Sequence, residues 1–176
     1  MRNFAFVATS IDGFIADKDG GIDWLQSVPN PEQSDLGYND FIEQMDAIIM
    51  GRNTFETVCG FDIDWPYKIP VFVLSNSLKE IPIAYAKNAF LVKGSLSEIL
   101  DQIHKKGHNQ LYIDGGATIQ SFLKEELVDE LIITTIPIVL GDGIPLFSKL
   151  NQSVTLELVS SKVFNKHLVQ SHYRKK

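Results

Sequence analysis

The chain is poor in cysteine, and this shortage excludes several kinds of protein. Its 176 residues include one cysteine, Cys59, so neither an internal disulfide nor a zinc site of the two- or four-cysteine kind can form. No histidine lies near Cys59 in the sequence to activate it as a nucleophile. We therefore expect a protein of a reducing compartment, without a metal ion and without a catalytic cysteine.

Basic residues and long apolar runs are also scarce. Lys and Arg number 16 against 22 Asp and Glu, which gives a formal net charge of −6 and argues against general nucleic-acid binding. We interpret the basic C-terminus, residues 174–176, as a solvated tail. No apolar run approaches the length of a membrane span, and residues 1–10 contain no cleavable signal segment. We expect a cytoplasmic protein without nucleic-acid or membrane partners.

The length and composition suit one globular domain over residues 1–176. Hydrophobic residues make up 44% and charged residues 22%, which is ordinary for such a domain. A chain of this length can bury one full core but not two comfortable ones. It contains no internal repeat and no low-complexity block.

Two strand–glycine–helix stretches are the most informative feature. Residues 110–114 (Gln-Leu-Tyr-Ile-Asp) resemble a buried strand and run into Gly115 and Gly116, after which a helix-like stretch begins. Residues 49–56 repeat this order around Gly51. Glycine lets the backbone come close to a phosphate, and the start of a helix offers N–H groups and a positive dipole end. Two such turns predict a cofactor with several phosphates.

The hydrophobic pattern predicts strands that alternate with helices. The predicted strands cover residues 3–9, 46–51, 69–74, 89–92, 110–114 and 131–140. Helices are predicted over residues 33–45 and from 95 to about 106, where Ser95 and Glu98 form a capping-box pattern. Residues 10–24 form a long glycine-rich loop, which is typical of a lid.

The end of the chain differs, because residues 154–163 and 167–173 indicate a hairpin that turns at Asn165 and Lys166. The whole pattern predicts an α/β fold with a mostly parallel sheet and an antiparallel C-terminal hairpin. Ligands of such sheets bind beyond the carboxyl ends of the strands. The residues expected at those ends are Ser10, Gly51, Ser75, Lys93 and Gly115.

Several motifs resemble those of dihydrofolate reductase-like reductases. Residues 50–56 (Met-Gly-Arg-Asn-Thr-Phe-Glu) resemble the Met-Gly-Arg-x-Thr-(Trp/Phe/Tyr)-Glu motif of dihydrofolate reductases, and residues 113–116 resemble their Gly-Gly turn. Residues 10–16 (Ser-Ile-Asp-Gly-Phe-Ile-Ala) and 137–147 resemble instead the reductase domain of riboflavin biosynthesis. The two families share one fold. The resemblance therefore implies a three-layer dihydrofolate reductase-like fold, nearer the riboflavin branch.

The resemblance implies NADPH as the hydride donor and a set of residues that bind it. The implied cofactor site, from the phosphates to the nicotinamide, comprises Gly51, Arg52, Thr54, Ser75, Gly115, Gly116, Ala117, Thr118, Ala8 and Ile15. In this set Ser75 would meet the adenosine 2′-phosphate. Without its neighbours, Arg52 is better interpreted as a surface ion-pair partner. Ser75 is interpreted equally well as an ordinary turn residue at the end of a strand.

The resemblance also implies a carboxylate that serves proton delivery. Dihydrofolate reductases carry one sixteen residues before the motif glycine, and counting back from Gly51 gives Asp35. Thr134 would be its companion, and Asp12 is a second carboxylate candidate. The alternatives are that Asp35 caps a helix and that Asp12 shapes a turn.

Two further acids adjoin glycines, but neither is taken as a catalytic candidate. Asp142 lies in Gly-Asp-Gly, which is typical of a tight turn, and Asp114 is set aside with it. Trp24 either closes the 10–24 loop over the pocket or belongs to the core.

The substrate half of the site matches neither relative. Residues 61–68 (Phe-Asp-Ile-Asp-Trp-Pro-Tyr-Lys) contain two acids and no Arg where dihydrofolate reductases have a Pro-x-Pro-Gly-Arg-type segment. Residues 57–60 replace the Asp-Pro-x-Leu-x-x-Arg segment of the riboflavin branch. One cysteine cannot build the zinc deaminase domain that accompanies that branch, so we expect no such domain here.

The sequence thus predicts an NADPH-dependent reductase of a pterin- or aminopyrimidine-like small molecule, similar to the 5-amino-6-(5-phosphoribosylamino)uracil reductases. Dihydrofolate reduction is the alternative within this class. An NADPH-binding sensor without catalysis is the alternative from another class. Because relatives in the riboflavin branch commonly pair, the resemblance also allows a homodimer, which no residue pattern in this chain indicates.

Overall fold

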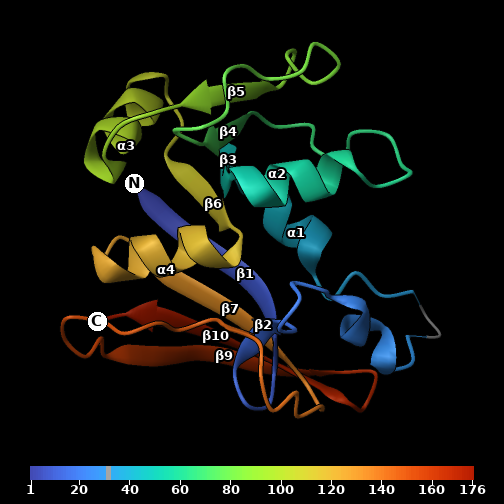
Figure 1. Cartoon of the computed structure of the whole chain (residues 1–176). Coiled ribbons are helices and arrows are strands. Elements are labelled where there is room, and N and C mark those ends of the chain that lie inside the picture. The colour runs from blue at the N-terminus through green and yellow to red at the C-terminus, as the bar shows by residue number, and fades with distance from the viewer. Residues whose placement is uncertain (31–32) are drawn as a thin grey trace.

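An eight-stranded sheet forms the middle of the computed structural model, which describes residues 1–30 and 33–176. The strands stand in the order β5-β4-β3-β6-β1-β7-β10-β9 (Figure 1). Their bounds are β1 (Arg2–Ser10), β3 (Ala47–Gly51), β4 (Val71–Leu74), β5 (Ala89–Val92), β6 (Gln110–Asp114), β7 (Glu130–Ile136), β9 (Leu156–Phe164) and β10 (Leu168–Lys175). The predicted α/β fold is confirmed.

The sheet is parallel from β5 to β7 and antiparallel beyond β7. β1 lies between β6 and β7, and β3 lies between β4 and β6. β10 pairs antiparallel with both β7 and β9. The β9–β10 hairpin turns at Asn165 and Lys166, whose positive φ values of 51° and 63° suit a two-residue turn. The predicted C-terminal hairpin is therefore confirmed.

Helices cover both faces of the sheet and give three layers. The helices are α1 (Tyr38–Ile42), α2 (Arg52–Cys59), α3 (Leu96–Lys105) and α4 (Gly116–Lys124). α3 and α4 pack on one face, whereas α1 and α2 pack on the other. In the described part of the chain, no helix combines the length and the hydropathy that a membrane crossing requires.

β3 shows how a central strand serves both layers. Successive side chains of a strand point to opposite faces. Ile49 accordingly packs with α3 and α4, whereas Ile48 and Met50 pack with α1 and α2. All three are completely buried, and a parallel strand covered on both faces is apolar throughout for this reason.

The predicted capping box begins α3. Ser95 Oγ accepts the N–H of Glu98 at 3.3 Å, and Glu98 Oε2 accepts the N–H of Ser95 at 2.9 Å. The helix stops before Gly107, whose φ is 93°. Both predicted ends of this helix are confirmed.

The helix predicted over residues 33–45 is wrong in length, because α1 contains only residues 38–42. Leu36 and Gly37 have φ values of 56° and 84°, so the backbone before Tyr38 is left-handed and cannot continue a right-handed helix. A hydrophobic pattern with helical spacing does not reveal such a break.

The loop predicted over residues 10–24 is only partly a loop. It contains β2 (Phe14–Ala16), which pairs antiparallel with β8 (Ile144–Pro145), and it leads into a 3₁₀ helix, η1 (Asp23–Ser27). The strand predicted over residues 131–140 ends earlier, at Ile136, because the following Pro137 has no N–H to donate. The chain beyond it runs to β8.

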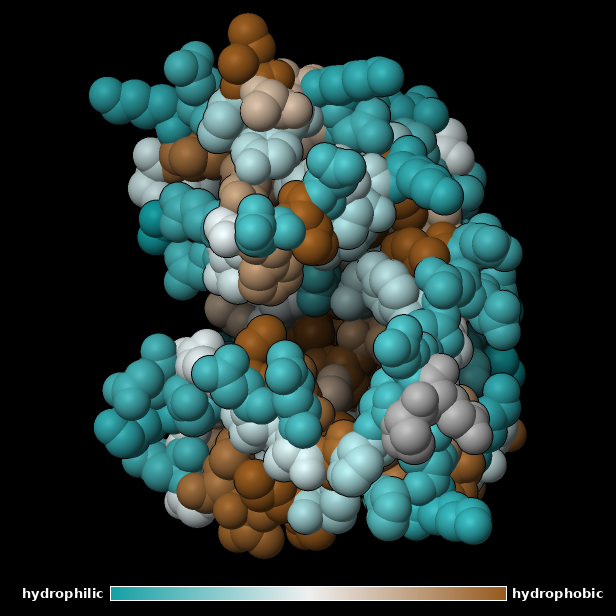
Figure 2. Space-filling view, turned by 90° about the vertical axis from the view of Figure 1, so that its right-hand side faces the viewer, coloured by the Kyte–Doolittle hydropathy of each residue, from teal (hydrophilic) through white to brown (hydrophobic). Residues whose placement is uncertain are grey.

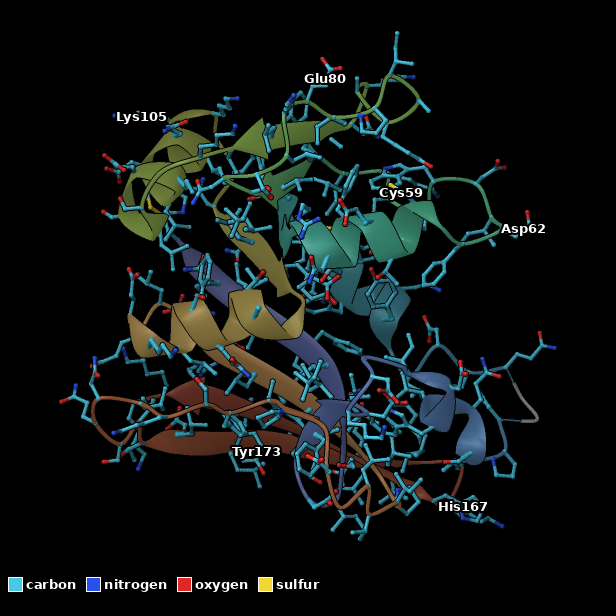
Figure 3. All side chains as sticks on the ribbon, viewed as in Figure 1. Cys59, Asp62, Glu80, Lys105, His167 and Tyr173 are labelled. Atoms are coloured by element: carbon cyan, nitrogen blue, oxygen red, sulfur yellow. The ribbon has the colours of Figure 1, made fainter. Side chains whose placement is uncertain are left out.

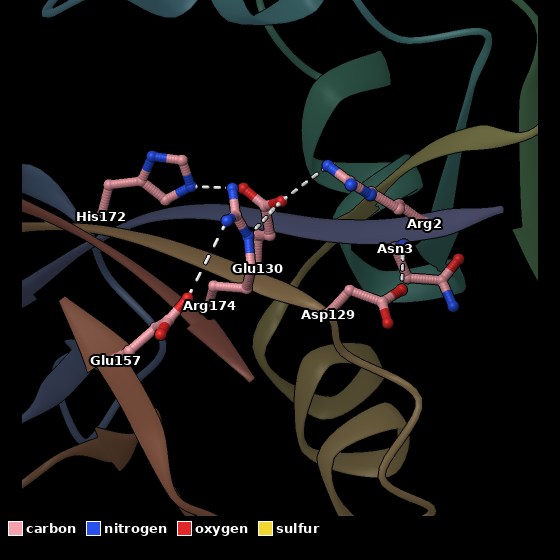
Figure 4. Close-up of polar contacts among 7 residues, drawn as sticks. All are labelled: Arg2, Asn3, Asp129, Glu130, Glu157, His172 and Arg174. Carbon is pink, nitrogen blue, oxygen red and sulfur yellow. Dashed lines mark hydrogen bonds and ion pairs between the residues drawn. The ribbon is translucent and has the colours of Figure 1, made fainter. Parts of the chain in front are cut away.

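One buried carboxylate joins three strands near the amino end of β1 (Figure 4). Glu130 is the first residue of β7, and its side chain is 4% exposed. Its Oε1 lies 3.1 Å from Nη1 of Arg2 on β1. His172 and Arg174 of β10 approach the carboxylate to 2.5 and 3.2 Å. A buried charge is tolerated only when partners replace its hydration. The cluster therefore fixes β1, β7 and β10 against one another.

We expect Glu130→Gln to lower the free energy of unfolding by about 2 kcal/mol, because the cluster loses its central charge while the two arginines stay partly hydrated. Urea denaturation monitored by circular dichroism measures this change. Glu157→Gln is the control, since Glu157 is half exposed and lies 3.9 Å from Arg174. It should change stability by less than about 0.5 kcal/mol. Equal effects of the two substitutions would contradict the prediction.

Candidate active site

The carboxyl ends of the parallel strands open into a crevice on one side of the molecule. Ser10 of β1, Gly51 of β3, Leu74 of β4 and Asp114 of β6 are the last residues of their strands. Figure 2 views this side and shows it hollowed, with hydrophobic residues deep in the hollow and hydrophilic residues around it. Ligands of open α/β sheets bind at this edge.

The two glycine turns contact each other through threonine side chains. A side-chain carbon added to Gly115 would overlap Oγ1 of Thr54 on α2. One added to Gly51 would lie 3.0 Å from Oγ1 of Thr118 on α4. Gly115 also has a φ of 87°, which glycine adopts without strain. This reciprocal packing brings the starts of α2 and α4 together.

β2 approaches the same place from the other side. A side-chain carbon on Gly116 would overlap Cδ1 of Ile15, which lies on β2. Gln120 of α4 donates from Nε2 to the carbonyl oxygen of Pro145 at 2.6 Å, and Pro145 belongs to β8. The β2–β8 pair is thus held against the first turns of α4. The structure therefore brings together six of the predicted cofactor residues, namely Ile15, Gly51, Thr54, Gly115, Gly116 and Thr118.

α2 and α4 begin without a side-chain cap. Their N-cap residues are Gly51 and Gly115, no side chain accepts a hydrogen bond there, and neither first turn contains an acid. α3 has both a capping serine and a first-turn Glu98. The first N–H groups of α2 and α4 are left for water or a ligand, and both dipoles favour an anion. Two such helix ends in contact fit the phosphates of a dinucleotide.

Arg52 and Ser75 have partners within the chain. Arg52 Nη1 donates to the two carboxylate oxygens of Glu56 at 3.2 and 3.1 Å on the surface of α2. Ser75 Oγ accepts the N–H groups of Ser77 and Leu78 at 3.2 and 2.9 Å. These contacts are the ion pair and the turn that the sequence offers as alternatives. A role of either residue toward a cofactor stays a prediction.

Asp35 is exposed and holds the turn before α1. Its carboxylate accepts the N–H groups of Gly37 and Asn39 at 3.0 and 2.8 Å. The hydrogen bond from Asn39, followed by that from Gly37, lowers the pKa of Asp35. The capping alternative is thus realised, and proton delivery by this carboxylate stays a prediction.

Asp12 is also exposed and connects two turns. It accepts a hydrogen bond from Ser10 Oγ at 2.6 Å and from the N–H groups of Leu140 and Gly141 at 3.2 and 2.8 Å. The Ser10 hydroxyl is the main cause that lowers the pKa of Asp12. Asp12 thereby ties the turn after β1 to the segment after β7.

Thr134 is linked through Gln170 to the segment that contains Asp35. It is 2% exposed on β7 and stands opposite Ala8 of β1 in the parallel ladder. Gln170 of β10 donates from Nε2 to Thr134 Oγ1 at 2.9 Å and to the carbonyl oxygen of Leu36 at 3.0 Å. Gln170 therefore joins Thr134 to the residue that follows Asp35. The β7–β10 register creates this link, and the sequence does not reveal that register.

Asp114, which the sequence does not mark as a catalytic candidate, differs from Asp12 and Asp35 in its environment. It ends β6 directly before the glycine pair, and its Oδ1 accepts the N–H of Gly115 at 2.8 Å. Burial raises the pKa of Asp114, although hydrogen bonding acts in the opposite direction. A raised pKa keeps a carboxyl protonated to higher pH, as a proton donor requires. The signal in the sequence is an acid between a buried strand and two glycines.

Two tyrosines near Asp114 lie on the α1 and α2 side of the sheet. Burial raises the pKa of Tyr38 to about 12, and the nearby charge of Asp114 adds to this rise. Burial and the same charge raise the pKa of Tyr67. The ring of Tyr38 packs edge-on against Phe6, with centroids 5.7 Å apart, and that of Tyr67 against Trp65 at 5.2 Å. Aromatic side chains therefore border Asp114.

Comparison with known proteins agrees with this arrangement. The family model of the RibD C-terminal domain matches residues 4–170. YwjB of Bacillus subtilis (strain 168), a protein of uncharacterised function, is 38% identical over 98% of this chain and 97% of its own. A protein of Shewanella sp. PV-4, named provisionally for riboflavin biosynthesis, is 52% identical over 100% of this chain and 99% of its own, with a TM-score of 0.96. The predicted resemblance is confirmed.

More distant structures show the fold alone. The deaminase/5-amino-6-(5-phosphoribosylamino)uracil reductase of Thermotoga maritima has a TM-score of 0.75 and 14% identity, over 99% of this chain and 56% of the other. The dihydrofolate reductase of Enterococcus faecalis, complexed with NADP(H), has a TM-score of 0.68 and 20% identity, over 99% of this chain and 96% of the other. The dihydrofolate reductase-like fold predicted from the motifs is confirmed.

We expect Asp114→Asn to stabilise the protein at neutral pH. Because folding raises the pKa of Asp114, ionising it costs stability, and this cost grows as the pH rises from the unfolded pKa through the folded one. The variant never ionises, so it should gain stability over the wild type at pH 7 and little at pH 4. Urea denaturation at both pH values measures the difference.

Asp35→Asn is the matched control, and we expect it to change the stability at pH 7 in the opposite direction. Folding lowers the pKa of Asp35, so its charge contributes stability that is present above the unfolded pKa and is lost as the pH falls through the folded one. This variant should lose stability at pH 7 and less at low pH. The same pH trend in both variants would refute the assignment of the two carboxyls.

Proposed function

We propose, from the premise that the chain belongs to the RibD C-terminal domain family, that it is an NADPH-dependent reductase of a pterin- or aminopyrimidine-like ring. The observation that carries this proposal is the meeting of two uncapped helix starts at interlocked glycine turns, beside Asp114. This arrangement supplies an anion site and a protonatable group at one edge of the sheet.

The chain's own residues would hold the cofactor through its phosphates. The N–H groups at the starts of α2 and α4 would bind the pyrophosphate, with Thr54 and Thr118 packed between them. Ser75, at the end of the neighbouring β4, would meet the 2′-phosphate, and Ala8 and Ile15 would border the nicotinamide. NADPH, when bound, supplies a hydride to an electron-poor C=N or C=O carbon.

Asp114 is the residue that we propose to deliver the proton. Hydride addition to a ring C=N leaves a nitrogen that must be protonated. Asp114 lies next to the glycine pair, and burial raises its pKa, so it keeps a proton to higher pH than an ordinary carboxyl does. Asp12 and Asp35 are less suited, because hydrogen bonds lower the pKa of each.

The segment after β1 would exclude water from the reacting groups. β2 packs over the start of α4, and Asp12 ties its turn to the segment that leads to β8. Trp24 of η1 follows, and in the described structure its buried indole N–H has no hydrogen-bond partner. Trp24 lies at the end of the segment predicted as a lid. An indole N–H without a partner there supports a hydrogen bond to a ligand or to an ordered water.

The test of this function is a panel of reducible pterins, folates and aminopyrimidine ribosylamines offered with NADPH, followed by loss of NADPH absorbance. We expect oxidation with at least one pterin or aminopyrimidine. Residues 61–68 contain no arginine to anchor a glutamate tail, so dihydrofolate should be a poorer substrate. Binding of NADPH without oxidation by any of these rings would contradict the reductase and favour a sensor.

We expect Ala117→Asp to weaken NADPH binding by about tenfold or more, because it places a negative charge where the pyrophosphate would bind. Ala117 is exposed at the second position of α4. The control is Ser97→Asp, at the second position of the capped α3, which should leave the affinity unchanged. Isothermal titration calorimetry reports both values, and equal affinities would argue against the phosphate site.

We expect Asp114→Asn to lower kcat about 100-fold while the affinity for NADPH stays the same. In the wild type kcat/KM should fall as the pH rises through the raised pKa of Asp114, and the variant should lack this fall. Asp142→Asn is the matched control, because Asp142 also precedes a glycine and accepts its N–H at 2.8 Å. Full activity of the Asp114 variant would remove this residue from proton delivery.

A further inference from the structure

Four features indicate which substrate rings this site accepts. The first is that two tyrosine hydroxyls donate to no carbonyl oxygen of the described chain. The hydroxyls of Tyr85 and Tyr112 donate to carbonyl oxygens of the chain. Within residues 1–30 and 33–176, those of Tyr38 and Tyr67 have no such partner. Both rings are held by aromatic packing, against Phe6 and Trp65. Fixed aromatic rings with open hydroxyls suit a flat polar ligand.

The second feature is that the loop after α2 is acidic. It carries Asp62 and Asp64 against one lysine, Lys68. Trp65 of this loop packs against Tyr67 of the same loop and against Phe55 of α2, which fixes the loop to that helix. Figure 3 shows Asp62 at the outer tip of this loop, on the side that Figure 2 views.

The third feature is the position of the arginines. The chain has only three, and arginine is the side chain that best clamps a phosphate or carboxylate. Arg52 pairs with Glu56 on α2, in the cofactor half. Arg2 and Arg174 bind the buried Glu130. No arginine is therefore left for an anionic arm of the substrate.

The fourth feature is a groove between α1 and the C-terminal hairpin, with a volume of about 760 Å³. Phe6 and Gln170 line it near Thr134, whereas Glu130 lines its far end. Glu130 lies four residues before Thr134 on β7, which is roughly 13 Å along a strand. Arg2 and Arg174, which bind Glu130, thus lie toward the end of the groove that is away from Thr134. Lys162, opposite Gln170 in the ladder, is nearer but exposed on the edge strand.

We infer that the substrate is a flat amino-substituted heteroaromatic ring that is neutral or cationic and has no phosphate or carboxylate arm. This inference rests on the proposed function, since it concerns the same site. The ring would lie between Tyr38 and Tyr67 with its nitrogens toward Asp114. An anionic arm would meet Asp62 and Asp64, and neither acid has a salt-bridge partner among the described residues. The protein would thus bind an amino-substituted ring and discriminate against the same ring with a phosphate or carboxylate arm.

The test compares two aminopyrimidines, 5-amino-6-ribosylaminouracil and its 5′-phosphate, in NADPH oxidation and in calorimetric binding. We expect kcat/KM for the unphosphorylated ring to exceed that for the phosphate at least tenfold. The double substitution Asp62→Asn, Asp64→Asn should narrow this ratio, because it removes the repulsion. Equal or better use of the phosphorylated ring would overturn the inference. If Lys162→Gln then abolished the preference for the phosphorylated ring, the groove beside Lys162 would be the site that holds the phosphate arm.

Binding separates this inference from the reductase proposal. If neither ring oxidises NADPH, the proposed reaction fails for these rings, but calorimetry still compares their affinities. Tighter binding of the unphosphorylated ring then supports the inference on its own. Tighter or equal binding of the phosphate, or no binding of either ring, overturns it. Tyr67→Phe should weaken the binding of the unphosphorylated ring about fivefold and leave the binding of NADPH unchanged. An equal loss of affinity for the ring and for NADPH would indicate a structural role for Tyr67.

Discussion

The reciprocal packing of two threonines against two glycines is the contact on which the site depends. Thr54 of α2 occupies the space beside Gly115, and Thr118 of α4 occupies the space beside Gly51. A side-chain carbon on Gly115 would overlap Thr54, and one on Gly51 would lie tightly against Thr118, so the two turns fix each other's position. The starts of two helices consequently meet at the carboxyl edge of the sheet with their N–H groups open. The proposals on phosphate binding and on proton delivery both follow from this placement.

The two ends of the sheet hold carboxyl groups in opposite environments. At the amino end of β1, Glu130 is surrounded by two arginines and a histidine, which serve stability. At the carboxyl end of β6, Asp114 has a backbone N–H and tyrosines around it, so burial raises its pKa. A carboxyl that the fold leaves without a cation is costly, and such groups gather at functional sites. All three arginines are bound to acids, which leaves none for the side of the crevice where we propose that the substrate binds.

Much of the fold could be predicted because its signals are local. The alternation of apolar strands with helices, the Ser95 capping box and the turn at Asn165 each depend on a few neighbouring residues. The misjudged parts depend on contacts between distant segments. The β2–β8 pair joins residues far apart in the chain, and the left-handed Leu36 that shortens α1 carries no mark in the hydrophobic pattern. Register, which brings Gln170 to Thr134, is likewise invisible in the sequence.

The same distinction applies to the candidate site. The glycine turns were visible as motifs, and the structure brings them together. The sequence does not reveal the raised pKa of Asp114, because this shift comes from burial that only the assembled fold creates. Asp35 was selected by spacing from a motif, yet its carboxylate caps a turn on the surface. The most direct test of the account is a crystal structure of the protein soaked with NADP⁺. The account predicts the pyrophosphate at the starts of α2 and α4, beside Gly51 and Gly115. A dinucleotide bound elsewhere, or none at concentrations that saturate reductases, would contradict it.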